Sequence, residues 1–334
     1  SYLGLSRMAD ATRELKRALE LYRSQFGGHD LRTAECLHML GWSDSWVGDH
    51  EQADLALRTA AAEFEQSLGP RDDRTLSAKL SLAMFLMQMG IEGGYVEGEQ
   101  LVREVLAIRR ERLGDASRDA IMVKAMLSYA RHAAGDGEGA RQLGQDALAQ
   151  LLALPNHTGS DEFFCRLVLG NGELSCGNQT EAEEQFRAIV KSSDRVAGTG
   201  SLPWAAAHYR LGFCLLRQQR WTESEDNLRE ALVAFRRTAG LSHTYTAYCV
   251  VQLARAYFGQ GRPEQARTQL RNIIHDCVRE IGPDHPRTLW AMTNSAFVLL
   301  EHGHLEEAES LARDALNRYR RTLNVPNRHM LDAI

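Results

Sequence analysis

The sequence contains little lysine and none of the short motifs that mark the common catalytic sites. It has 35 arginines but only four lysines, Lys16, Lys79, Lys124 and Lys191. We interpret this bias as a sign of GC-rich, bacterial coding. No P-loop, GxGxxG, GxSxG or HExxH motif is present. Because no pattern brings a nucleophile, a base and a pocket together, we expect a protein that is not an enzyme.

The sequence also lacks the motifs of metal-binding, phosphate-binding and redox-active sites. The glycine-rich stretch GIEGGYVEG lacks the Lys-Ser/Thr of a phosphate-binding loop, and His302 and His304 have no ligand partners at metal-binding spacing. We therefore expect no cofactor and no metal. No CxxC pair occurs, so we expect free thiols, mostly buried in helices, in a reducing cytoplasm. These thiols belong to Cys36, Cys165, Cys176, Cys214, Cys249 and Cys277.

The chain also lacks a signal peptide and any long hydrophobic run, so we expect no membrane span. Its formal net charge of −5 argues against a general binder of nucleic acid or of an anionic membrane. Hydrophobic residues make up 44% of the chain, which is enough for an extended core. We expect a cytoplasmic protein.

What the sequence does contain is a repeat. A turn position recurs every 42 residues, with a single step of 45, at Gly48, Gly90, Gly135, Gly177, Gln219, Gly261 and Gly303. A second position closes each unit with the same steps, at Gly27, Gly69, Gly114, Asn156, Gly198, Gly240, Gly282 and Asn324. Glycine, and after it asparagine, most readily adopts the left-handed conformation that ends helices. We therefore expect Asn156 and Asn324 to be left-handed.

Each unit is predicted to be a helical hairpin. In the cleanest copy, 282–324, the first helix should run from Thr288 to His302, with Asp284 as its N-cap and Gly303 ending it. The second helix has one apolar face, formed by Ala308, Leu311, Ala312, Ala315, Leu316 and Tyr319. One hairpin cannot bury two such faces alone, so neighbouring hairpins must stack.

Two columns of small residues keep the same register and predict close helix packing. In the first helices the pair is Leu40-Gly41, Leu82-Ala83, Leu127-Ser128, Leu169-Gly170, Leu211-Gly212, Leu253-Ala254 and Ser295-Ala296. In the second helices the small residue is Ala53, Gly98, Ala140, Ala182, Ser224, Ala266 or Ala308. The one three-residue insertion falls between Gly90 and Gly98, where we expect a surface excursion.

The spacing within the unit resembles that of tetratricopeptide repeats. Leu169-Gly170, Ala182 and Phe186 fit that pattern, and the 42-residue length with GPDHPRTL at its start is similar to the kinesin-light-chain type. The resemblance implies an all-α, right-handed superhelical solenoid of antiparallel helix pairs. Such repeats often carry an asparagine that holds a peptide backbone, but here the column reads Met39, Ser81, Met126, Val168, Arg210, Gln252 and Asn294.

We predict one solenoid over residues 1–334, cut within a repeat at both ends and so a fragment of a longer chain. Two linker-like breaks, LALPNHTGS and SSDRVAGTGSLP, are either longer loops or a hinge. The predicted boundaries are a half repeat 1–27, the repeats 28–69, 70–114, 115–156, 157–198, 199–240, 241–282 and 283–324, and the start of another at 325–334.

In tetratricopeptide arrays the first helices line the concave side, so aromatic and arginine side chains there are candidates for binding a partner. The alternative is that these rings are buried between neighbouring repeats. The candidates are Trp42, Tyr129, Phe164, Tyr209, Arg210, Phe213, Arg217, Tyr248, Arg255, Trp290, Asn294 and Phe297.

These residues favour a scaffold that binds a peptide or protein segment with apolar anchors and some acidic residues. Similar arrays are often the sensing or docking part of larger bacterial signalling proteins. An oligomerisation module, or a sensor of a small signalling ligand, remains the alternative.

Overall fold

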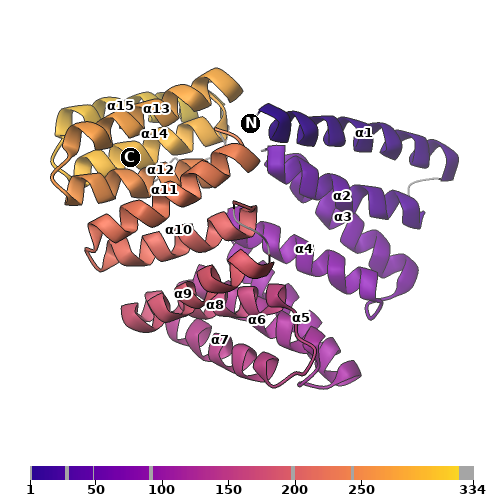
Figure 1. Cartoon of the computed structure of the whole chain (residues 1–334). Coiled ribbons are helices and arrows are strands. Elements are labelled where there is room, and N and C mark those ends of the chain that lie inside the picture. Colours follow the sequence, from indigo (N-terminus) through magenta and orange to yellow (C-terminus); the bar gives the residue numbers. More distant parts are fainter. Residues whose placement is uncertain are drawn as a thin grey trace. The chain divides into compact units, whose positions relative to one another are not determined.

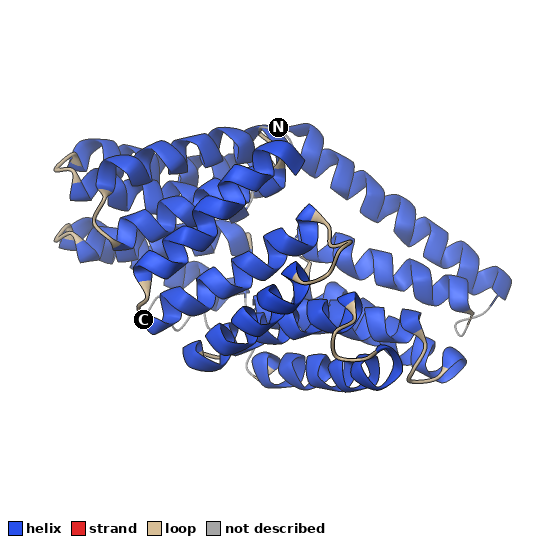
Figure 2. Cartoon of the chain, turned by 60° about the horizontal axis from the view of Figure 1, so that its bottom comes forward, coloured by secondary structure: helices blue, strands red, loops and turns tan. Residues whose placement is uncertain are grey.

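A computed structural model describes residues 2–26, 30–47, 49–89, 93–196, 200–241 and 244–322. In this part of the chain there are fifteen helices and no strand, which confirms the predicted all-α class (Figure 2). The chain divides into two compact units between Cys176 and Gly177. We call residues 3–176 the N-terminal unit and residues 177–334 the C-terminal unit. The division coincides with neither of the two linker-like breaks in the sequence.

The N-terminal unit contains α1 (Tyr2–Phe26), α2 (Leu31–Val47), α3 (His50–Leu68), α4 (Asp73–Met89), α5 (Gly94–Leu113), α6 (Arg118–Ala133), α7 (Gly137–Leu152) and α8 (Gly159–Cys176). The C-terminal unit contains α9 (Gln179–Val196), α10 (Leu202–Arg217), α11 (Trp221–Thr238), α12 (Thr244–Gly259), α13 (Pro263–Ile281), α14 (Pro286–Glu301) and α15 (Leu305–Thr322). Within each unit, helices that follow one another in the chain pack side by side as antiparallel hairpins (Figure 1). This is the solenoid architecture that the repeat predicts.

The turns confirm most of the predicted helix stops. Gly135, Gly177, Gly261 and Gly303 all have positive φ, as do the unit-closing glycines Gly69, Gly114, Gly240 and Gly282. Where the turn position lacks glycine, Gln219 takes the same conformation with φ 60°. The remaining predicted positions, Gly27, Gly48, Gly90, Gly198 and Asn324, lie outside the described residues.

Two local predictions are wrong. Among the described residues Gln219 is the only non-glycine with positive φ, so Asn156 is not left-handed; α7 has already ended at Leu152. The N-cap of α14 is His285, whose Nδ1 accepts from the Arg287 amide at 3.1 Å, rather than Asp284. The predicted surface excursion between Gly90 and Gly98 lies partly outside the described residues, which resume at residue 93, and α5 begins at Gly94.

The small-residue columns bring the two helices of a hairpin close together, as predicted. A Cβ added at Gly212 of α10 would lie 2.8 Å from Leu228 Cγ of α11. Where one of the two facing residues is serine, its hydroxyl bonds across the contact: Ser224 Oγ donates to the Gly212 carbonyl at 2.7 Å. In an earlier hairpin the serine is on the first helix: Ser128 Oγ on α6 donates to the Ala140 carbonyl on α7, also at 2.7 Å.

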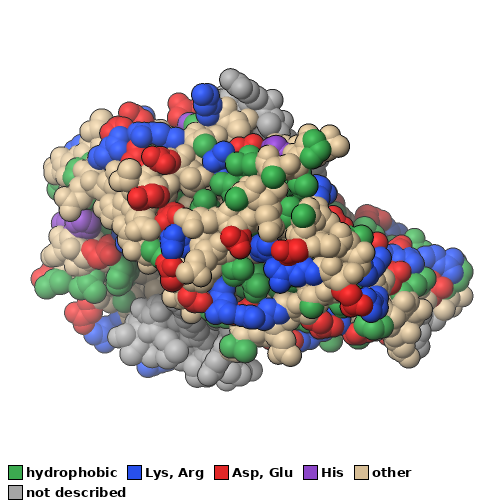
Figure 3. Space-filling view, turned by 90° about the horizontal axis from the view of Figure 1, so that it is seen from below, with side chains coloured by type: hydrophobic (Ala, Val, Ile, Leu, Met, Phe, Trp, Pro, Cys, Tyr) green, Lys and Arg blue, Asp and Glu red, His purple; other side chains and the backbone are tan. Residues whose placement is uncertain are grey.

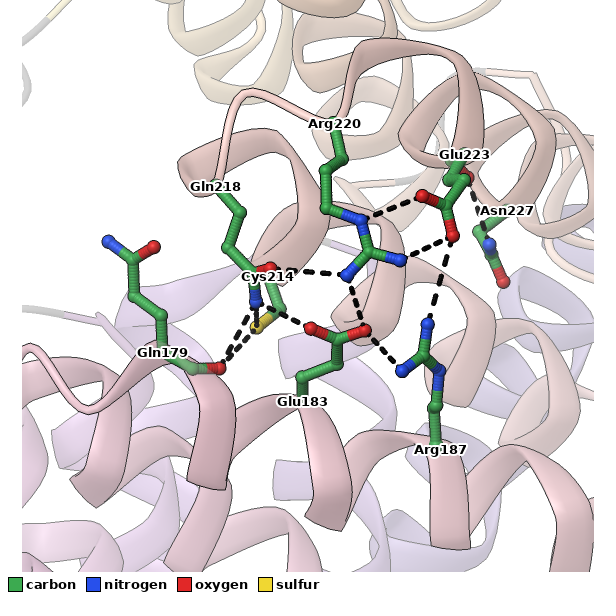
Figure 4. Close-up of polar contacts among 8 residues, drawn as sticks. All are labelled: Gln179, Glu183, Arg187, Cys214, Gln218, Arg220, Glu223 and Asn227. Atoms are coloured by element: carbon green, nitrogen blue, oxygen red, sulfur yellow. Dashed lines mark hydrogen bonds and ion pairs between the residues drawn. The ribbon is translucent and has the colours of Figure 1, made fainter.

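A polar clamp joins successive hairpins in the C-terminal unit (Figure 4). Glu183 on α9 is nearly buried, and it receives Gln218 Nε2 at 2.7 Å and Arg220 Nη1 at 2.7 Å from the turn between α10 and α11. Gln218 also donates to the Gln179 carbonyl at 3.2 Å. The second helix of one hairpin is thus bonded to the turn of the next.

The clamp recurs 42 residues later. Glu225 on α11 receives Gln260 Nε2 at 2.9 Å and Arg262 Nη1 at 2.7 Å, and Gln260 donates to the Trp221 carbonyl at 3.3 Å. One more step along, the corresponding residues are Arg267, His302 and His304, so no third copy forms. The clamp therefore fixes the relative placement of the hairpins α9 to α13.

The core of each unit consists of the apolar faces between helices. In the last hairpin Ala308, Ala315 and Tyr319 are buried, as the predicted apolar face requires. Six free cysteines are present, five of them buried and Cys176 partly exposed. Burial raises the pKa of the Cys214 thiol to about 11 and that of Cys277 to about 12, as expected for inert core thiols.

Candidate binding surface

The first helices of three successive hairpins, α10, α12 and α14, present one matched stripe each. The stripe positions on each helix are spaced i, i+4, i+7 and i+11, so they share one side of the helix. Because of the 42-residue step, corresponding stripe residues form four rows across the three helices. The stripes are Ala206, Arg210, Phe213 and Arg217 on α10; Tyr248, Gln252, Arg255 and Gly259 on α12; and Trp290, Asn294, Phe297 and Glu301 on α14.

We call these twelve residues the α10–α14 surface. None of them is fully buried, whereas the residues directly beside them, such as Leu211, Leu253 and Ala296, are core. The helices α10 and α12, and α12 and α14, are neighbours in space (Figure 1). The stripes therefore lie side by side on an accessible face of the C-terminal unit. This observation goes against the alternative that the inner rings are all buried between repeats.

Aromatic rings form the apolar part of this surface. Tyr248 and Trp290 meet edge to face with ring centroids 4.4 Å apart. Phe297 is 52% exposed, an unusual state for a phenylalanine in the middle of a helix. Tyr209 lies beside the surface and packs against the core, and burial raises the pKa of its hydroxyl.

The three arginines of the surface differ in their partners. Arg255 Nε donates to Glu301 Oε2 at 2.8 Å, Arg255 Nη1 donates to Gln252 Oε1 at 3.1 Å, and the guanidinium carbon lies 5.9 Å from the Phe297 ring centroid. Arg210 and Arg217 have no carboxylate within ion-pair distance in the described part of the chain. Two cationic groups on α10 are thus available for an anion.

The second row is the column that holds asparagine in similar arrays. In this unit it reads Arg210, Gln252 and Asn294, and all three carry N–H donors. One N–H of Asn294 is already used, since Nδ2 donates to the Trp290 carbonyl at 3.0 Å. The same column holds no amide or guanidinium in the N-terminal unit.

The structure places eight of the twelve predicted residues on the α10–α14 surface and Tyr209 beside it, and it leaves three apart. Trp42 on α2, Tyr129 on α6 and Phe164 on α8 belong to the N-terminal unit. Each is half-buried and packs against a core cluster of that unit. Trp290 is half-buried and packs against a core cluster in the same way, so what sets these three rings apart is that they lie outside the matched stripes of the C-terminal unit.

Four of the twelve residues of the α10–α14 surface were not among the candidates, namely Ala206, Gln252, Gly259 and Glu301. Gln252 could have been found, because it is one 42-residue step from Arg210 and from Asn294. The position of Glu301 could have been found in the same way, because it lies two 42-residue steps from Arg217. Its contact with Arg255 could not, because that pair spans 46 residues, one helical turn out of register with the repeat. Pattern matching at a fixed period does not find contacts that break the period.

One face of the molecule carries charges of both signs. Figure 3 shows a face on which acidic and basic side chains alternate, without a broad region of one sign. A cavity of about 530 Å³ lies elsewhere, between α13 and α15, and none of the predicted residues lines it. Its wall combines Arg267, Arg271 and His275 with Glu306, Glu307 and Asp314 over an apolar floor.

In the described part of the chain, no group of three or more histidine, cysteine or acidic residues is placed to hold a metal ion. No helix there is long and apolar enough to cross a membrane. The arrangement on α10, α12 and α14 can offer apolar contact, cation–π stacking, hydrogen-bond donors and positive charge. Those are the contacts of a recognition surface rather than of a reaction.

Comparison with known proteins agrees with this class of repeat scaffold. A family model described as tetratricopeptide repeat matches residues 204–274 and 273–321. No curated protein matches the sequence. A kinesin light chain with nearly identical TPR-like repeats, from Podosopora anserina, is 17% identical with a TM-score of 0.53, over 63% of this chain and 99% of that one.

Two further structures have a similar fold over most of this chain. The apo quorum sensor NprR from B. thuringiensis has a TM-score of 0.63 at 11% identity, covering 95% of this chain and 86% of that one. A Rap protein complexed with competence and sporulation factor has a TM-score of 0.60 at 13% identity, covering 99% and 94%. At such low identity these likenesses establish the fold alone.

The chain is therefore built as a stack of helical hairpins. Residues 204–321 match the tetratricopeptide repeat directly, and the resemblance predicted from the 42-residue unit is confirmed there.

Proposed function

We propose that this chain is a non-catalytic scaffold that binds a peptide or protein segment on the α10–α14 surface. The segment carries at least one apolar or aromatic anchor and several acidic residues. The chain acts in the cytoplasm as the sensing or docking region of a larger bacterial regulatory protein, and the predicted repeat boundaries describe its architecture.

The observation that carries this proposal is the set of accessible stripes on α10, α12 and α14. An exposed Phe297 and the Tyr248–Trp290 pair offer apolar contact. In the described residues Arg210 and Arg217 offer charge without an internal carboxylate partner, although Arg210 lies 5.7 Å from the Tyr209 ring centroid. Aromatic and arginine side chains are the residues enriched at the energetic centres of protein interfaces. Since two arginines are open on one helix, the complementary partner is acidic.

The similar proteins agree with this assignment without establishing it. One is named as a quorum sensor and another is complexed with a signalling factor. Both share the fold over most of this chain, so a sensing role fits the architecture.

The test is selection from a peptide array by the full chain, followed by affinity measurement on the selected peptides. We expect selected sequences to combine acidic residues with an aromatic or large apolar residue. The double substitution Arg210→Glu and Arg217→Glu should weaken binding at least tenfold, because both sites of attraction become repulsive.

The control is Arg320→Glu with Arg321→Glu, which makes the same charge change at exposed positions on α15. Equal loss in both variants would mean that net charge alone governs binding, and would contradict the surface assignment. Light scattering separates the oligomerisation alternative: a monomer near 37.4 kDa at all concentrations removes it.

A further inference from the structure

Arg255 is at the centre of the α10–α14 surface and is the only arginine of its three stripes that already has a carboxylate partner in the described residues. Its Nε lies 2.8 Å from Glu301 Oε2, and its guanidinium lies 5.9 Å from the ring centroid of Phe297. The side chain of Arg255 is 19% exposed and that of Glu301 is 37% exposed. The pair is therefore accessible from the face where a partner would bind.

The contact between Arg255 and Glu301 occurs next to a position where the repeat is irregular, the fourth row of the surface. The fourth row of the surface reads Arg217, Gly259 and Glu301. On α12 this row has no side chain, because Gly259 is needed elsewhere: a Cβ there would lie 2.4 Å from the Trp221 ring. Gly259 therefore offers Glu301 no partner in the fourth row, and the Glu301 carboxylate contacts Arg255 in the third row instead. The same carboxylate adds negative charge to the face that otherwise attracts acidic groups.

We propose that Glu301 is an internal competitor of the partner: it occupies Arg255 in the free protein, and a partner carboxylate replaces it on binding. The proposal rests on the proposed function of the α10–α14 surface. Arg210 and Arg217 attract the acidic segment first, since neither has a carboxylate to give up. Arg255 then exchanges one carboxylate for another while its guanidinium stays next to Phe297.

This exchange of carboxylates determines how acidic a segment must be to bind. An apolar or weakly acidic segment leaves the Arg255–Glu301 pair in place and gains nothing from Arg255. A segment with a carboxylate in the right position gains that contact but must displace Glu301, and Glu301 then repels it as a like charge. Glu301 therefore lowers the affinity for acidic segments and limits binding to those with enough acidic groups.

The experiment measures binding of two fluorescein-labelled probes to the full chain at low salt. The first is a twelve-residue peptide with one tryptophan and four glutamates, and the second replaces the glutamates by glutamines. We expect Glu301→Gln to tighten binding of the glutamate probe about three- to tenfold, and to change binding of the glutamine probe less than twofold. The gain should vanish in the Arg255→Gln background, because the exchange needs that guanidinium.

The matched control is Glu306→Gln, which removes the same charge from an exposed position at the start of α15. If Glu301→Gln binds the glutamate probe no better than wild type or Glu306→Gln, while Arg210→Glu with Arg217→Glu still weakens binding, the competitor role is wrong and the binding surface stands. If neither wild type nor Glu301→Gln binds the glutamate probe, both proposals are contradicted.

Discussion

At the residue scale, Gln219 shows how strictly the 42-residue step is kept. It is the one non-glycine residue with positive φ in the described chain, and it stands where every other described copy has glycine. A side chain with a Cβ is less stable in this conformation than glycine by roughly 1 kcal/mol. Its side chain is exposed and makes no hydrogen bond to the described residues that would offset this cost.

We therefore expect Gln219→Gly to raise the free energy of unfolding by about 0.5–1 kcal/mol, even though glycine adds entropy to the unfolded chain. Urea denaturation followed by circular dichroism measures the change. The comparison variant is Glu230→Gly, an exposed position inside α11, where glycine should instead destabilise by about 1 kcal/mol. A loss of stability in Gln219→Gly would show that the turn is not strained.

Single residues also mark the limit of what the sequence could predict. The small-residue columns, the turn glycines and the candidate stripes follow from a fixed period, and a period is visible in one sequence. The N-cap of α14 was placed one residue too early because both Asp284 and His285 can cap a helix, and only the backbone geometry selects His285. The Arg255–Glu301 pair depends on side-chain reach, which no period encodes.

At the scale of elements, the clamp on Glu225 explains how one hairpin is fixed to the next. Burial tends to raise the pKa of the Glu225 carboxyl, but hydrogen bonds from Gln260, Arg262 and Arg229 outweigh it and hold the pKa below its ordinary value. Because the pKa of Glu225 is lower in the folded than in the unfolded chain, its carboxylate stabilises the fold. This contribution to the free energy of unfolding is complete above the unfolded pKa of a glutamate, about 4.3. That stability is lost as the pH falls through the folded pKa.

We expect Glu225→Gln to lower the free energy of unfolding at pH 7 by about 1–3 kcal/mol, because Arg262 loses its buried charged acceptor. The difference from wild type should shrink as the pH falls below about 4, where wild-type Glu225 also becomes neutral. Denaturation curves at a series of pH values test this. Glu230→Gln, exposed on the same helix, is the control, and an equal effect there would exclude a specific role for the clamp.

The clamp also explains why the last hairpin differs. A third copy of the clamp would need an acidic residue at position 267, a glutamine at 302 and an arginine at 304. The sequence has Arg267, His302 and His304 at these positions. Arg267 instead pairs with Glu264 at 2.6 Å and with Glu307, and the ring of His302 stacks on Phe258 with centroids 4.2 Å apart. The cavity between α13 and α15 lies next to these replaced residues.

At the scale of the whole molecule, fold class and repeat length could be predicted, but the division into two units could not. The period runs unbroken through Cys176 and Gly177, so the sequence predicts one array, whereas packing separates residues 3–176 from residues 177–334. The same packing decides which candidates form a surface. Aromatic residues occur in first helices throughout the chain, but only in the C-terminal unit do they lie beside arginines on a matched face.

The most direct measurement is photo-crosslinking from a bound segment. A selected acidic peptide carrying a benzophenone next to its aromatic anchor is bound to the full chain and irradiated, and the attached residues are identified by mass spectrometry. The account predicts crosslinks on α10, α12 and α14, at or beside Phe213, Tyr248 and Phe297. Crosslinks confined to the N-terminal unit, or to the cavity between α13 and α15, would contradict it.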